Sequence, residues 1–511
     1  MNINLTKLFN YMCKNGHLED AQHILEVFPG LNISADTEQA FQWACCHGHI
    51  QVAQWLLTIK PNLDISAEEE EAFCMACENG HLVIAQWLYE LKTTLDISAR
   101  NEYAFRGACS QGHLHVAQWL YQIKPTLDIS ANNEWAFQMV CQEGHLQVAQ
   151  WLYELKPTLN ISAENEQAFQ LACFYGHLEV VQWLYEIKPS LDVSALNEHA
   201  FGGACKQGHL EIAQWLYQIK PTLDISANDE YAFCWACKHG HLLVAQWLYQ
   251  IKPTLDISAE NEFAFRNACA GGHLLVAQWL YMSKPTLNIS ADNEWAFILT
   301  CQEGHIQVAQ WLFSIKPTLD ISAENEEAFQ FACAKGHLQV AQWLYMSKPT
   351  LDISANNEGP FRMACLCGHI QVVQWLYQIK PTINISARNE EAFRLACYDG
   401  HLEVAQWIQS LNPNKYVIES KNVEKNNRIK YKIINSLNKS KPILYKEHID
   451  ICSICSVTVC DIQTYCNHTF CELCIQTWFN SNIQNNTCPY CRACLTDTVI
   501  QPIAILSDGN S

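Results

Sequence analysis

The chain has 511 residues, of which 49% are hydrophobic and 16% are charged, and its formal net charge at pH 7 is −20. Such an acidic balance disfavours nucleic acid as a general partner, and the absence of a run of about 18 apolar residues predicts no membrane span. The first residues, Met1 to Lys7, lack the apolar stretch of a secretory signal. The chain is too long for one hydrophobic core, so we expect a modular architecture.

The first 410 residues are internally repetitive. The pair Gly-His recurs thirteen times at a constant spacing of 32 residues, from Gly16 to Gly400, without any insertion. A fixed period of this size predicts a stack of units, each of which buries one face against its neighbours. We therefore expect a mostly α-helical solenoid of thirteen repeats over residues 1–410.

Each repeat predicts two helices. In the last repeat, apolar residues at helical spacing run from Ala392 to Cys397, and Gly400 then ends the helix in a left-handed conformation. A second apolar stripe follows over residues 402–408. In most repeats a Lys-Pro pair stops this second helix, because proline cannot continue it, and an extended link leads to the next repeat.

The stretch Ala-Cys-x-x-Gly-His-Leu-x-Val-Ala resembles the ankyrin consensus Ala-Ala-x-x-Gly-His-Leu-x-Val-Val. The link is one residue shorter than in the family's 33-residue unit and lacks its hairpin glycine. We therefore expect the paired helices of an ankyrin-type solenoid without a well-formed β-hairpin. The array also resembles ankyrin arrays of large DNA viruses, which would place the protein in a host cytoplasm.

Thirteen of the seventeen cysteines before residue 411 recur with the repeat. Equivalent atoms of stacked helices lie about 8–10 Å apart, whereas a disulfide needs Cα atoms within about 7 Å. These cysteines are therefore predicted to be buried free thiols in a reducing, cytoplasmic environment.

Two further residues recur and are predicted to serve the stack. The tryptophan of the Gln-Trp-Leu segment, present from Trp55 to Trp407, is expected in the core. The Gly-His histidines are too far apart to share a metal ion, and we interpret them as turn residues that bond to the adjacent backbone. His23 replaces the tryptophan in the first repeat, where a polar residue suits a terminal cap.

Two positions vary most between repeats, which suggests that they face outward. The first, at the start of the first helix, is aromatic in five repeats: Tyr103, Trp135, Tyr231, Phe263 and Trp295. The second lies three residues later and includes Arg106 and Arg362. In ankyrin arrays this region borders the partner-binding face, so we interpret the five rings as an exposed stripe that binds a substrate protein. Local packing of the rings against the link is an equally weighted alternative.

Residues 411–447 form a predicted basic linker. Nine Lys or Arg residues face four acidic ones over 411–450, whereas residues 1–410 hold 22 basic and 44 acidic residues. We interpret the segment as a solvated tether. A contact with RNA through Lys430 and Lys432, with an acidic partner or with the array remains an alternative.

Residues 448–511 contain eight metal-type ligands in pairs two or three positions apart: Cys452, Cys455, Cys466, His468, Cys471, Cys474, Cys488 and Cys491. Thiolate and imidazole are the ligands that tetrahedral zinc prefers. Eight ligands make two closed four-ligand sites, which leaves no open position for hydrolytic chemistry. We therefore expect two structural Zn²⁺ ions.

The pattern resembles the RING finger of ubiquitin ligases. The resemblance implies a small α+β domain in which Cys452, Cys455, Cys471 and Cys474 hold one zinc while Cys466, His468, Cys488 and Cys491 hold the other. The run from Leu495 to Leu506 is expected to add an extended segment to this domain.

The resemblance also assigns roles to residues between the ligands. Ile454, Trp478 and Pro489 match contacts to the ubiquitin-conjugating enzyme, and Arg492 matches the cation that bridges ubiquitin and that enzyme. The implied protein is a RING-type ubiquitin-protein transferase that carries no ubiquitin thioester itself, with the array holding the substrate. The alternative is a non-enzymatic ankyrin scaffold, in which these residues are core or solvated surface of a protein-binding zinc module.

Overall fold

A computed structural model describes residues 2–418, 431–433, 462–463, 469–470 and 501–502. Its contacts divide the chain into two units, Met1–Ile433 and Ile434–Ser511, and each unit is described by itself. Within the described residues, no helix combines the length and the apolar character that crossing a membrane requires.

The first unit is built from thirteen helix pairs, one for each Gly-His repeat. The pairs in chain order are α1 (Asn2–Lys14) and α2 (Leu18–Val27), α3 (Ala35–Cys46) and α4 (Ile50–Ile59), α5 (Ala67–Glu78) and α6 (Leu82–Leu91), α7 (Ala99–Ser110) and α8 (Leu114–Ile123), α9 (Ala131–Gln142) and α10 (Leu146–Leu155), α11 (Ala163–Tyr175) and α12 (Leu178–Ile187), α13 (Ala195–Gln207) and α14 (Leu210–Ile219), α15 (Ala227–Lys238) and α16 (Leu242–Ile251), α17 (Ala259–Ala270) and α18 (Leu274–Ser283), α19 (Ala291–Gln302) and α20 (Ile306–Ile315), α21 (Ala323–Ala334) and α22 (Leu338–Ser347), α23 (Ala355–Leu366) and α24 (Ile370–Ile379), and α25 (Ala387–Tyr398) and α26 (Leu402–Leu411). The predicted helical solenoid is thereby confirmed.

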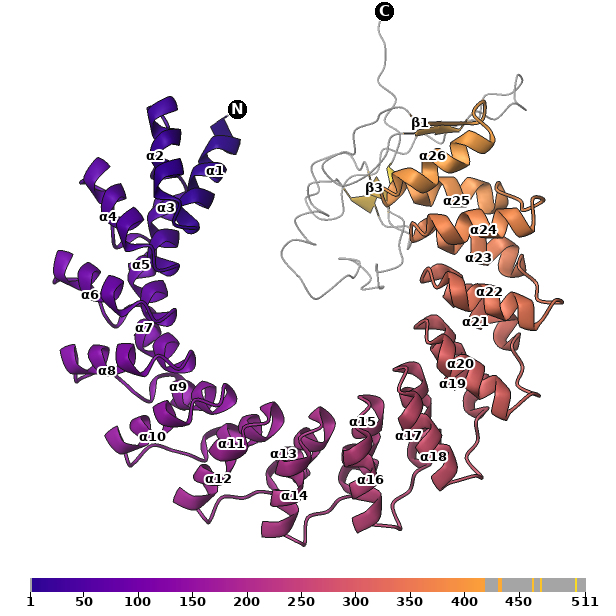
Figure 1. Ribbon diagram of the computed structural model, residues 1–511, viewed down its shortest axis with the longest axis horizontal. Helices are drawn as coiled ribbons and strands as arrows, with labels where there is room; N and C mark the ends of the chain where they lie inside the picture. Colours follow the sequence, from indigo (N-terminus) through magenta and orange to yellow (C-terminus); the bar gives the residue numbers. More distant parts are fainter. Residues whose placement is uncertain (1, 419–430, 434–461, 464–468, 471–500, 503–511) are drawn as a thin grey trace, which may run out of the picture. The chain divides into compact units, whose positions relative to one another are not determined.

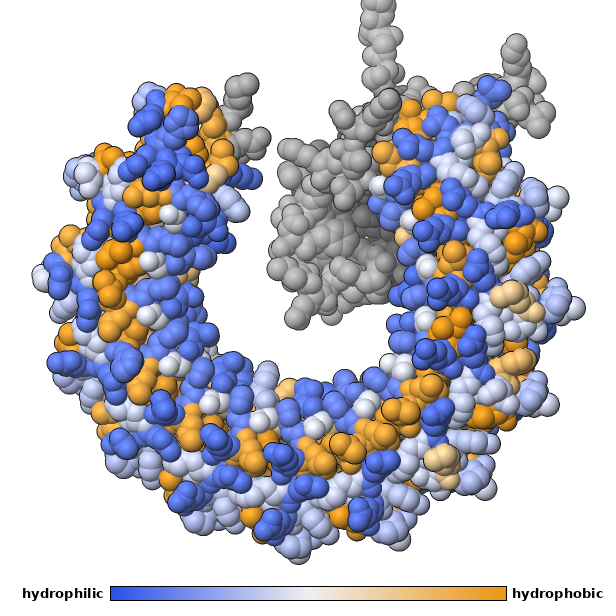
Figure 2. Space-filling model, in the orientation of Figure 1, coloured by the Kyte–Doolittle hydropathy of each residue, from blue (hydrophilic) through white to orange (hydrophobic). Residues whose placement is uncertain are grey.

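The two helices of a repeat have different neighbours. Each odd-numbered helix packs against the odd-numbered helices of the repeats before and after it, and these first helices line the inner side of the row. Each second helix packs behind its own first helix, on the outer side (Figure 1). Figure 2 shows hydrophobic residues following the row of repeats as a broken band with hydrophilic residues along its inner margin.

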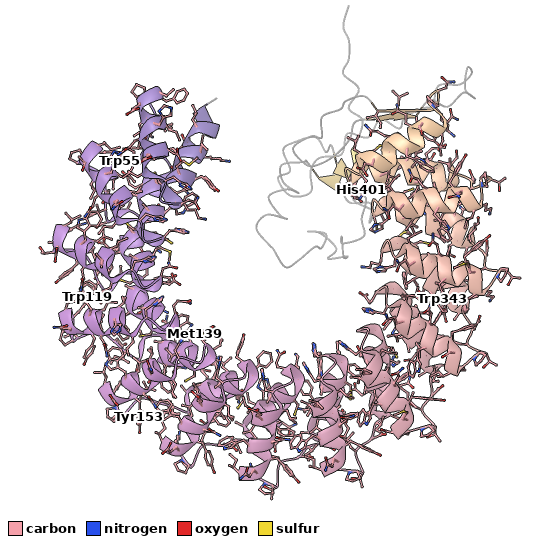
Figure 3. The ribbon with its side chains drawn as sticks, in the orientation of Figure 1. Trp55, Trp119, Met139, Tyr153, Trp343 and His401 are labelled. Atoms are coloured by element: carbon pink, nitrogen blue, oxygen red, sulfur yellow. The ribbon has the colours of Figure 1, made fainter. Side chains whose placement is uncertain are left out.

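The core of the array is the helical stripe that the sequence predicts. In repeat 5, Phe137 on α9 and Leu152 on α10 are fully buried or nearly so, and the equivalent residues are buried in the other repeats except Ile24 of repeat 1, which is half-buried. The recurring tryptophan joins neighbouring repeats: the Trp119 ring lies 6.2 Å from the Phe73 ring and 6.0 Å from the Tyr89 ring of the preceding repeat (Figure 3). These tryptophans are half-buried and pack against the buried core without lying inside it, so the expected core position is borne out only in part.

The cysteines of the array behave as predicted. All seventeen are free, and the thirteen that recur with the repeat are buried. Burial raises the pKa of the Cys13 thiol to about 12, and the thiols at the centre of the array are shifted in the same direction. They are therefore protonated, apolar core residues.

The Gly-His turn connects repeats as well as helices. Gly176 has φ +92°, a left-handed conformation that strains any residue with a side chain. A Cβ atom placed there would also lie 2.5 Å from Cε1 of His209 in the next repeat. The His209 ring nitrogen Nε2 in turn lies 3.1 Å from the Phe174 carbonyl oxygen at the end of α11. The predicted backbone contact of these histidines is thus present, and its partner is the preceding repeat.

The links contain no β-hairpin in the described array, as expected. Near the start of α9, Asn132, Asn133 and Glu134 instead adopt φ of 55°, 59° and 62°, and other first helices begin with an equivalent left-handed turn. Non-glycine residues rarely adopt this conformation, which costs roughly 1–2 kcal/mol each. The turn therefore requires specific stabilisation.

A polar network around the glutamate of each turn supplies that stabilisation. Glu134 is 7% exposed. Its carboxylate accepts hydrogen bonds from Ser130 Oγ at 2.6 Å and from the Asn160 backbone N–H at 3.2 Å. Lys156 of the Lys-Pro pair donates to the same serine hydroxyl. The link after the second helix is thereby fastened to the start of the first helix of the same repeat.

The last repeat closes the network differently. Asn412 stands where other repeats have the lysine, and Lys415 reaches Glu390 at 2.6 Å instead. The Tyr416 hydroxyl donates to the same carboxylate at 2.5 Å. Burial alone would raise the pKa of Glu390, but these hydrogen bonds more than offset it and the pKa is lowered. Strand β1 (Tyr416–Ile418) then pairs antiparallel with β2 (Tyr431–Ile433), so the contacts assign part of the predicted linker to the array unit.

The second unit contains three described strands. They are β3 (Ile462–Gln463), β4 (Thr469–Phe470) and β5 (Gln501–Pro502). β3 lies between the other two and pairs antiparallel with both. The position of β5 agrees with the extended segment expected between Leu495 and Leu506.

Candidate functional site

In the sequence, six of the eight predicted zinc ligands lie between the three short strands, and Cys452 and Cys455 precede them. β3 and β4 form a hairpin in which Gln463 pairs with Thr469, and the sequence between these two residues contains Cys466 and His468. Cys471 directly follows β4. The eight ligands themselves lie outside the described residues, as do Ile454, Trp478, Pro489 and Arg492.

The ligand set is chemically complete in the sequence. Its order is three cysteines, one histidine and four cysteines, and sulfur and imidazole nitrogen are donors that fit zinc. Elsewhere, over the part of the chain that the structure describes, no group of three His, Cys, Asp or Glu side chains is arranged to hold a metal ion.

The structure corrects the exposure expected for the aromatic stripe. Tyr103, Trp135, Tyr231, Phe263 and Trp295 are all half-buried rather than exposed. Tyr103 donates a hydrogen bond to Glu78 of the preceding first helix at 2.9 Å, and the Arg106 guanidinium lies 4.8 Å from the Trp135 ring centroid. In both cases the ring contacts the first helix of the preceding repeat. Whether these rings bind a substrate stays a prediction.

The second variable position is mostly buried, which also differs from the expectation. Arg106 is 9% exposed and Arg362 is 5% exposed. Arg106 Nε donates to the Asn101 carbonyl at 2.7 Å, and Arg362 Nε donates to the Asn357 carbonyl at 2.9 Å. These side chains cap the left-handed turn of their own repeat. Burial lowers the pKa of both guanidinium groups, which remain charged.

The two variable positions meet across the repeat boundary, 29 residues apart. Arg362 forms an ion pair with Glu391, and a Cβ atom on Gly202 would lie 3.0 Å from the Tyr231 ring. A change at one position therefore calls for a matching change at the other. We interpret the variation at these two positions as a result of this pairing. In one sequence, such variation looks the same as variation at an exposed position.

A partly overlapping set of half-buried residues forms a surface feature that the sequence pattern did not single out. The ammonium groups of Lys206 and Lys238, at the ends of α13 and α15, each lie 4.3 Å from the Trp235 ring centroid. Each is also 5.9 Å from a second ring, Phe174 for Lys206 and Phe263 for Lys238. The only signal in the sequence was that lysine occupies this helix position in repeats 7 and 8 and otherwise only in repeat 1.

Comparison with known proteins identifies both parts of the chain. The family described as "Ankyrin repeats (3 copies)" matches residues 9–101 and 105–197. The family described as "Zinc finger, C3HC4 type (RING finger)" matches residues 452–498, which include all eight predicted ligands.

A curated relative, E3 ubiquitin-protein ligase RNFT1 of Danio rerio, is 41% identical over 61 residues. The match covers 12% of this chain and 14% of that protein, so most of either chain lies outside it. The similarity concerns one segment and leaves the rest of the relative uncompared. On the two family matches, the chain is an ankyrin-repeat protein with a C-terminal RING finger of the C3HC4 type.

Proposed function

We propose that this protein is a RING-type ubiquitin ligase whose ankyrin array holds the substrate. The observation that carries the proposal is the complete C3HC4 ligand set inside the RING-family match, followed directly by Arg492. The partial similarity to a curated ubiquitin ligase supports the same reading. The proposed place of action is the cytoplasm.

Zinc would have a structural role in this proposal. Cys452, Cys455, Cys471 and Cys474 would hold one ion, and Cys466, His468, Cys488 and Cys491 would hold the other. Bound zinc supplies folding free energy on the order of 10 kcal/mol, which a domain of this size needs.

The chain's own residues would act by binding and orientation. Ile454, Trp478 and Pro489 would bind the ubiquitin-conjugating enzyme through apolar contacts. The forked guanidinium of Arg492 would bind an acceptor on ubiquitin and one on the conjugating enzyme at the same time. Fixing the flexibly tethered ubiquitin in one orientation brings its thioester into line with the attacking amine, which raises the rate of transfer without a covalent intermediate on this chain.

Discharge of ubiquitin from charged conjugating enzymes onto free lysine tests the proposal. We expect the full chain to stimulate discharge with at least one member of a broad enzyme panel, and Trp478→Ala, Arg492→Ala and Cys452→Ser to abolish it. Cys460→Ser is the matched control, because Cys460 lies outside the ligand spacing. Folded, zinc-loaded protein that stimulates no member of the panel would refute the ligase and leave the non-enzymatic scaffold.

A further inference from the structure

Repeats 6 to 9 carry an alternating row of aromatic rings and ammonium groups that the packing of the array does not explain. It consists of Phe174, Lys206, Trp235, Lys238 and Phe263, and we refer to it as the lysine–aromatic ladder. Successive members are 5.9, 4.3, 4.3 and 5.9 Å apart, measured from each ammonium nitrogen to the ring centroid. The ladder therefore continues across three repeat boundaries.

The lysines of the ladder differ from the lysines that build the fold. Those of the Lys-Pro pairs, such as Lys156, donate to the serine of the turn network. Over the described residues, the ammonium groups of Lys206 and Lys238 take part in none of the ion pairs or side-chain hydrogen bonds that other lysines of the array form. Both are half-buried, so their ammonium groups are held against aromatic rings while part of each remains accessible. Because the two ammonium groups are held in place and lack a counter-ion, they can bind an anionic group of a partner.

The surroundings add apolar and aromatic surface to this charge. His239 is exposed and stacks on Trp235 with ring centroids 5.6 Å apart. Leu243 and Leu275, at the second position of α16 and α18, are 68% and 67% exposed. In most other repeats the same position holds a glutamine, a glutamate or a histidine. Exposed apolar side chains at this position therefore accompany the ladder in repeats 8 and 9, whereas repeats 6 and 7 have glutamate there and repeat 3 has an exposed valine, Val83.

We infer that the ladder is a docking surface for a short acidic peptide segment that also contains apolar side chains. The charge of the site favours an acidic occupant. Residues 1–410 hold 44 acidic and 22 basic residues, so two lysines without a counter-ion form a local positive site on an acidic array. A long polyanion such as RNA would bring its further phosphates within about 8 Å of other parts of the acidic array and be repelled there. A short acidic segment would feel mainly the two lysines, since charges beyond about 8 Å are screened at physiological salt.

The ladder also indicates the length of the segment. The ladder's contact distances place the Phe174 and Phe263 ring centroids at most about 20 Å apart. An extended chain advances about 3.3 Å per residue, which makes the docked segment roughly six residues long. Under the proposed function, and resting on it in this respect alone, the segment belongs to the substrate.

Selection from a random library of displayed 12-residue peptides tests the inference with the full chain and without any conjugating enzyme. We expect peptides that bind the wild-type chain and are lost with Lys206→Glu/Lys238→Glu to be enriched in Asp and Glu. Their dissociation constants, measured by fluorescence anisotropy, should rise about tenfold in the double variant and also with added salt.

Lys14→Glu/Lys335→Glu is the matched control, because it makes the same change in net charge at repeats 1 and 11 and should leave binding within about twofold. Trp235→Leu keeps both charges but removes the ring between them, and it should weaken binding as well. Circular dichroism verifies that each variant is folded.

Three results would overturn the inference: no peptide sensitive to the ladder variants, sensitive peptides without acidic enrichment, or tighter binding of a single-stranded oligonucleotide than of the selected peptides. Ubiquitin discharge onto free lysine requires no substrate segment, so either proposal can fail without the other.

Discussion

Removal of the Glu134 side chain should destabilise one part of the array and leave the stability of the rest unchanged. In Glu134→Ala the Asn160 N–H loses its acceptor, and Ser130 and Lys156 lose the carboxylate beside them. Hydrogen bonds to a charged group contribute about 1.5–3 kcal/mol, and the left-handed turn at Asn132 and Asn133 loses its main support. We expect a local loss of about 2–4 kcal/mol.

Hydrogen exchange measured by mass spectrometry is the appropriate assay, because a repeat array can open locally and does not have a single unfolding free energy. A loss of 2 kcal/mol corresponds to about thirtyfold faster exchange. This change should appear in peptides covering residues 126–166 and be absent from repeat 11. Glu154→Ala is the control, because Glu154 is exposed on α10 of the same repeat and should change exchange by less than about 0.5 kcal/mol. Unchanged protection around Glu134, or an equal loss over the whole array, would refute the role of the network.

Further tests concern the turns, pH and zinc. Gly112→Ala should destabilise the boundary between repeats 4 and 5 by more than about 1 kcal/mol, because φ at Gly112 is +77° and the new Cβ would lie 2.6 Å from the His145 ring. Gly30→Ala should leave the stability unchanged, because a Cβ at that position meets nothing within 4 Å. Burial lowers the pKa of His113 and of His145 in the folded chain. Below about pH 6.5 the unfolded chain therefore takes up protons first, and the stability of the fold falls. A urea midpoint that is unchanged between pH 7 and pH 5 would contradict this. A zinc chelator should abolish ubiquitin discharge but leave the helical circular dichroism of the array, and metal analysis of the untreated chain should give two zinc ions; loss of the array's helices on chelation would contradict the separation of the two parts.

The repeat architecture could be predicted because the same pattern of residues recurs in each repeat. The apolar stripe, the left-handed glycine at Gly400 and the buried Cys397 follow from local rules, and thirteen copies remove the ambiguity of a single short stripe. The zinc-ligand set could be predicted for a related reason, because cysteine and histidine at this spacing have few other chemical interpretations.

Sequence variation was a poorer guide to exposure. Arg106 and Arg362 vary between repeats, yet they are buried and cap the turns of their own repeats. The stack brings each such position to a residue 29 positions later, as in the ion pair of Arg362 with Glu391. Variation that is compensated across a boundary looks the same in one sequence as variation that is tolerated at a surface.

The sequence by itself determined the number of repeats, their helices, the buried thiols and the C3HC4 ligand order, because these depend on local spacing and on the chemistry of single residue types. Only the tertiary structure decided how Glu134, Lys156 and the Asn160 N–H converge on one turn, and how Lys206 and Lys238 come to lie against Trp235. Except for Lys238 and Trp235, which lie three positions apart on α15, those contacts join residues that are far apart in the chain. Their distances are set by the packing of one helix or link on the next, which no local pattern specifies.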